Sequence, residues 1–140
     1  MKYFFLITFL SLLNLSVDAQ VEKDSLGFER FLYQEGDTTY VMKKYFMVFL
    51  KSGTVRSQNE LEAQRIQAAH LAHLDSLAKI GVLDIAGPFG DDGEVRGILI
   101  LRVSSLEEAE ALCMADPAVK AKRLTVEVHP WWAAEGSKLR

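Results

Sequence analysis

Residues 45–50 read YFMVFL and residues 95–103 read VRGILILRV. Both stretches carry apolar side chains at consecutive positions, which is typical of strands buried on both faces. Each stretch is followed by a segment of helical periodicity and then by a shorter strand pattern. The helical segments span 57–81 and 105–116, and the shorter strand patterns span 82–86 and 124–129.

Local signals support the helix boundaries. Ser57 and Glu60 have the spacing of a capping box, as do Ser105 and Glu108. The Asp-Pro step at 116–117 ends the second helix, because a residue before proline avoids the helical region. The order of elements is therefore β-α-β-β-α-β.

This order predicts an α+β domain with the ferredoxin-like motif, a four-stranded antiparallel sheet and two helices on one face. In that topology the first and third strands are central, which agrees with the two stretches that are apolar on both faces. The face without helices also needs a cover, and we expect a second copy of the protein to supply it as a homodimer. The alternative is that the N-terminal extension folds over this face.

The first 19 residues have the pattern of a signal peptide. Met1-Lys2 gives a basic start, an apolar run follows from Tyr3 to Leu15, and small residues precede a cleavage point after Ala19. The run is short for a membrane span. We therefore expect an exported protein, periplasmic or secreted, without stable membrane insertion after cleavage. The alternative is an uncleaved N-terminal anchor.

The rest of the chain divides into three parts. Residues 20–39 are expected to form a linker with a possible hairpin strand, 40–132 the folded domain and 133–140 a C-terminal tail. Over 140 residues the chain is 49% apolar and 25% charged with a net charge of −3, which fits one globular domain. Because acids and bases are interleaved, no nucleic-acid partner is expected. The single cysteine, Cys113, excludes an internal disulfide and is interpreted as a small buried hydrophobe.

Two ionisable residues fall on apolar helical stripes. His70 lies in the middle of the first stripe, and Asp116 lies at the end of the second, on the side of Leu112 and Cys113. Each is costly to bury without a partner, and the two helices pack side by side, so we expect them to pair. A carboxylate fixes the tautomer of a histidine and prepares it as a general base. The alternatives are a structural pair, or an Asp116 that only caps the following turn.

Other candidates are weaker. His73 is three residues from His70, but no third ligand has a suitable spacing, so no metal is expected. Asp91 and Asp92 between glycines lack the ligand count of a calcium loop. Arg96 could hold an anion near the site or be an ordinary charge at a strand end.

Several motifs resemble the YCII-related family. They are AHLA at 69–72, AGPF at 86–89, ADP at 115–117 and EVHPW at 127–131, in the family's order and spacing over residues 45–132. The family is similar in fold to muconolactone isomerase and includes a chloromuconolactone dehalogenase. The resemblance implies a dimer and a histidine–aspartate pair in a cleft, which corresponds to His70 and Asp116. Family members are typically cytoplasmic, and the export signal and residues 20–44 depart from that pattern.

The functional expectation is an enzyme of lyase or isomerase type that acts on a small organic molecule without a cofactor. His70 would be the base, Asp116 would orient it, and Pro88, Phe89 and Arg96 would border the substrate pocket. The alternative is a non-catalytic small-molecule-binding or structural homodimer.

Overall fold

The computed structural model describes residues 20–140. The expected signal peptide at 1–19 lies outside the described residues. The described chain forms a mixed α+β fold in which every strand pairing is antiparallel. Its strands are β1 (Glu22–Lys23), β2 (Glu29–Glu35), β3 (Thr38–Ser52), β4 (Leu83–Pro88), β5 (Val95–Leu101) and β6 (Leu124–Ala134). Its helices are α1 (Glu60–Lys79), α2 (Leu106–Ala115) and α3 (Pro117–Lys120).

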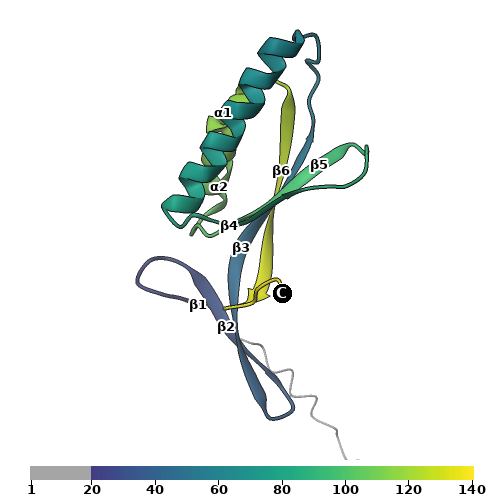
Figure 1. The fold of residues 1–140 in the computed structure, drawn as a ribbon. Helices are drawn as coiled ribbons and strands as arrows, with labels where there is room; N and C mark the ends of the chain where they lie inside the picture. The colour runs from purple at the N-terminus through teal and green to yellow at the C-terminus, as the bar shows by residue number, and fades with distance from the viewer. Residues whose placement is uncertain (1–19) are drawn as a thin grey trace, which may run out of the picture.

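The sheet has six strands, so the expectation of four was wrong. Four of them run in the order β6-β3-β5-β4, and the central strands β3 and β5 contain the two apolar stretches, as expected. The other two exist because β3 is 15 residues long. Its second half pairs with β5, while its first half extends beyond β5 and pairs with β2, which in turn pairs with β1. Figure 1 shows this N-terminal hairpin below the rest of the sheet.

The helices lie together on one face of the sheet (Figure 1). Because side chains alternate along a strand, Phe46, Val48 and Leu50 of β3 point to that face and form the core with Leu99 and Leu101 of β5. Val48 and Leu101 are completely buried. Burial of a side chain of this size stabilises the fold by about 1.5–3 kcal/mol.

The helix starts follow the capping rules, with one correction. Ser105 accepts a hydrogen bond from the Glu108 amide at 3.1 Å and is the N-cap of α2, as predicted. Helix α1, however, starts at Glu60 and not after Ser57, because Asn59 accepts from the Glu62 amide at 2.9 Å. Asparagine is as good an N-cap as serine, and here it lies immediately before the first helical residue.

Strand β6 is longer than its sequence pattern indicates. It pairs with β3 from Leu124 to Ala134, since the long β3 offers backbone partners over this whole length. Within the described residues no helix is both long and apolar enough to cross a membrane.

Candidate functional site

His70 and Asp116 are in direct contact. His70 lies in the middle of α1 and Asp116 at the junction of α2 and α3, and His70 Nδ1 is 2.6 Å from Asp116 Oδ2. The two residues are buried, with exposed fractions of 6% and 3%. The structure therefore brings together the two residues that the helical stripes single out.

The second oxygen of Asp116 holds α3. Oδ1 accepts a hydrogen bond from the Ala118 amide at 2.8 Å, so Asp116 is the N-cap of this short helix. Pro117 forces an extended conformation on Asp116 and occupies the first helical position, which needs no N–H. Asp116 thus pairs with His70 and caps the turn at the same time, one oxygen for each.

Asp116 is ionised despite its burial. Burial alone would raise the pKa of Asp116, but the hydrogen bonds from His70 and the Ala118 amide, together with the nearby His70 and His73, hold that pKa below its ordinary value. An ionised carboxylate only accepts hydrogen bonds, so Nδ1 of His70 must be the donor. The proton of the neutral ring then lies on Nδ1, and Nε2 carries the lone pair.

Nε2 is the reactive edge of the ring. It makes no hydrogen bond to the described residues. Among these residues, every fully buried side-chain nitrogen or oxygen has a hydrogen-bond partner, so an atom without one is not fully buried. Nε2 must therefore be accessible. His70 lines a cavity of about 440 Å³.

The cavity lies between α1 and the hairpin of β4 and β5. Its apolar wall is made by Leu50, Leu71, Leu74, Ala86, Gly87, Pro88, Gly97, Ile98, Leu99, Ala118 and Leu124. Its polar groups are Arg56, Gln67, His70, Arg96 and Arg123. A volume of this size, with apolar residues and several polar groups in its wall, fits a site for a small organic ligand.

Only two of the three expected pocket residues line this cavity. Pro88 and Arg96 line the cavity with His70, but Phe89 does not. Phe89 follows the last residue of β4, and its side chain is 44% exposed. The Arg96 guanidinium donates to the Gly93 carbonyl at 3.1 Å, so part of its hydrogen-bonding capacity closes the β4–β5 loop.

Arg56 and Arg123 also line the cavity, and the sequence patterns did not reveal them. Arg56 follows the end of β3, and Arg123 immediately precedes β6. Because β3 and β6 are antiparallel neighbours, the end of one lies beside the start of the other. The expected pairing of the first and last strands could therefore have indicated that these two arginines lie close together.

The weaker candidates have structural partners. His73 makes a hydrogen bond to the Leu112 carbonyl at 3.1 Å, which ties α1 to α2. Residues 20–140 contain no cluster of three or more potential metal ligands. Cys113 is buried in the core, and burial, with smaller contributions from Asp116 and Glu110, raises its pKa to about 11. At neutral pH this thiol is therefore protonated and unreactive.

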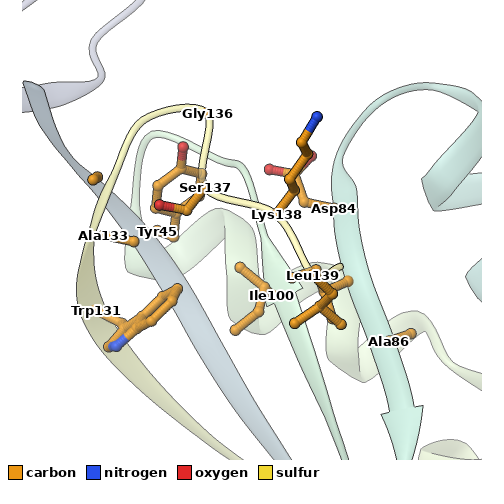
Figure 2. A pocket seen from close by; sticks show the side chains of 12 residues that line it. Tyr45, Asp84, Ala86, Ile100, Trp131, Ala133, Gly136, Ser137, Lys138 and Leu139 are labelled. Atoms are coloured by element: carbon orange, nitrogen blue, oxygen red, sulfur yellow. The ribbon is translucent and has the colours of Figure 1, made fainter.

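A second cavity of about 730 Å³ lies on the opposite face of the sheet. Figure 2 shows Tyr45, Ile100 and Trp131 on its floor and the C-terminal residues Lys138 and Leu139 crossing above them. This C-terminal segment covers one part of the face without helices. The cavity has no histidine, so we place the candidate site in the smaller one.

Comparison with known proteins identifies a family for most of the folded domain. The model of the YCII-related domain matches residues 46–132. A solved structure, the 5-chloro-2-hydroxyhydroquinone dehydrochlorinase from Burkholderia phenoliruptrix in complex with 2,5-dihydroxybenzoquinone, is similar with a TM-score of 0.49 and 24% identity. The match covers 62% of this chain and 92% of that one. No curated protein matches the chain. Since the family model covers more than half of the sequence, the chain belongs to the YCII-related family.

Proposed function

We propose that this protein is an enzyme of lyase or isomerase type, which uses His70 as a general base on a small organic molecule. One observation carries the proposal. His70 is held by an ionised carboxylate at 2.6 Å through Nδ1, its Nε2 makes no hydrogen bond to the described residues, and the residue lines a ligand-sized cavity. This is the arrangement that acid–base catalysis requires, because the base must be oriented and must also meet the substrate.

The reaction step follows from the tautomer. Nε2 takes a proton from a carbon or oxygen of the substrate, and the electron pair of that bond stays on the substrate. In an isomerase the imidazolium returns the proton at another atom, and in a lyase the electron pair expels a leaving group. Asp116 touches no substrate and is a positioning residue, which stabilises the imidazolium through Nδ1.

The test measures proton abstraction directly. The protein is incubated in D₂O with a panel of lactones and hydroxyquinones, and deuterium uptake is followed by NMR. We expect uptake into at least one compound with the native protein and none with His70→Gln. His73→Gln is the matched control, because His73 is on the same helix but binds the Leu112 carbonyl. Equal uptake with and without His70, or no uptake into any compound, would contradict the proposal.

The second candidate is a non-catalytic binding or structural role, and a specific observation favours it. The pair joins α1 to the start of α3, and both side chains are buried. A pair kept only for packing would make His70→Gln strongly destabilising. In the catalytic case, the variant loses exchange activity and keeps most of its stability.

We also propose that the protein forms a homodimer through the face without helices. Met47, Phe49 and Ile98 point to that face and remain only half-buried. An apolar surface of this kind is typical of an interface. Light scattering should show a dimer at micromolar concentration and a monomer for Phe49→Lys. A monomeric native protein would disprove the proposal.

The proposed location is the periplasm or the extracellular medium, after cleavage behind Ala19. The support is the basic start, apolar run and small residues of the first 19 positions. Mass spectrometry of the native protein should find an N-terminus near Gln20. An intact Met1 in the cytosolic fraction would refute export.

A further inference from the structure

We propose that the ligand of the His70 cavity is a small organic carboxylate, whose charged group binds between Arg56 and Arg123. This inference rests on the proposed function, since it names the substrate class of the same site. It starts from the charge of the wall. The sixteen lining residues include three arginines and no aspartate or glutamate, although the whole chain has a net charge of −3.

The backbone holds Arg56 and Arg123 together. The Arg123 carbonyl accepts from the Gly53 amide at 2.9 Å and from Arg56 Nη1 at 3.1 Å, and the Lys122 carbonyl accepts from the Val55 amide at 3.0 Å. A Cβ at position 53 would overlap the Lys122 carbonyl, so only glycine allows this close approach. The two arginines are thus held at the same end of the sheet although 67 positions separate them.

The positive charge of this pair is not neutralised by the protein. Within residues 20–140, neither Arg56 nor Arg123 is in salt-bridge distance of a carboxylate. Arg56 uses one donor on a carbonyl, and Arg123 uses one on Gln58 Oε1 at 3.0 Å. Because a guanidinium has five N–H donors, most donors remain for a ligand. Arg56 is exposed and Arg123 half-buried, both line the same cavity, and the fork geometry of a guanidinium fits a planar carboxylate.

The rest of the wall shows that the anion belongs to an organic molecule. Leucine and alanine residues make up much of the wall around His70. A cavity of about 440 Å³ is far larger than an inorganic anion needs. The fitting ligand therefore has an apolar body against these side chains, an acidic end at the arginines and its reacting proton at His70 Nε2.

The experiment compares benzoate with its neutral analogue benzamide. Binding to the full domain is followed by ¹H–¹⁵N NMR through the amides of Ala86 and Gly97, which line the cavity. We expect benzoate to shift these signals and to bind about tenfold or more tightly than benzamide, which is the effect of a charge-assisted hydrogen bond. Arg56→Gln and Arg123→Gln should each remove this preference. Arg65→Gln is the matched control, because it removes the same charge from an exposed position on α1 outside the cavity wall.

Two results would overturn the inference. One is equal binding of benzoate and benzamide, and the other is no shift of the cavity signals by benzoate at about 10 mM, well above a millimolar Kd. The inference would also be overturned if Arg65→Gln reduced the benzoate-induced shifts as much as Arg56→Gln does, because the effect would then come from the net charge of the protein. His70→Gln should still bind benzoate. If the protein prefers benzoate to benzamide but catalyses no deuterium exchange, only the proposed function is refuted. If it catalyses exchange but does not prefer benzoate, only this inference is refuted.

Discussion

Replacing Asp116 with asparagine should reverse the tautomer of His70 while the fold survives. In the native protein Oδ2 accepts from His70 Nδ1 at 2.6 Å, and Oδ1 accepts from the Ala118 amide at 2.8 Å. The asparagine oxygen can keep the bond to Ala118, but its NH₂ group must then face Nδ1. Nδ1 becomes an acceptor only if the ring proton moves to Nε2. The lone pair on the cavity side is lost.

The stability effect can be estimated from the same two bonds. The variant exchanges a charge-assisted bond for a neutral one, a loss of about 1–1.5 kcal/mol. Asp116→Ala removes both acceptors. It leaves the Nδ1 donor unpaired, at about 1–3 kcal/mol, and deletes an N-cap, at about 1 kcal/mol. We therefore expect the alanine variant to lose about 2–4 kcal/mol of a total stability of roughly 5–15 kcal/mol.

Two measurements test this reasoning. Urea unfolding near neutral pH gives the two free energies, and two-bond ¹H–¹⁵N spectra of histidine-labelled protein report the tautomer of His70. The matched control is Asp75→Asn, an exposed carboxylate paired with Lys79 on α1, which should leave the tautomer and the stability unchanged. A proton that stays on Nδ1 in Asp116→Asn would refute the proposed geometry, as would equal losses for the two Asp116 variants.

The remaining predictions concern pH, capping and packing. The pKa of Asp116 is lowered from 3.8, so its contribution to stability is present above that pH and is lost as the pH falls through the lower folded pKa. Across this acid range the free energy of unfolding of Asp116→Asn, measured in urea, should therefore depend less steeply on pH than that of the native protein. An equally steep dependence would contradict the ionised state of Asp116. Asn59→Ala should lower the free energy of unfolding by about 1 kcal/mol in thermal or urea unfolding, whereas Ser57→Ala should leave it almost unchanged. The opposite order would show that Ser57, and not Asn59, is the N-cap of α1. Gly53→Ala should destabilise by about 1–3 kcal/mol, because its Cβ would overlap the Lys122 carbonyl. A neutral result in the same unfolding assay would show that the loop can move away.

The sequence alone was sufficient for the central topology and for the site pair. The stretches 45–50 of β3 and 98–101 of β5 carry apolar side chains on both faces, which is typical of central strands, and both strands are central in the sheet. His70 and Asp116 were detectable for a related reason. An ionisable residue on an apolar stripe must have a partner, and in this topology the two stripes face the same side of the sheet.

Only the tertiary structure decided the features that depend on which backbones lie side by side. Strand β2 leaves most of its side chains exposed, so its alternation is weak and its membership of the sheet comes from pairing with the long β3. Arg56 and Arg123 are ordinary charges at the ends of two elements until the pairing of β3 and β6 places them on one cavity wall. Side-chain periodicity records how much of each residue is buried. It contains no information about which distant segment makes the contact, and that contact is what brings the arginines to the cavity of His70.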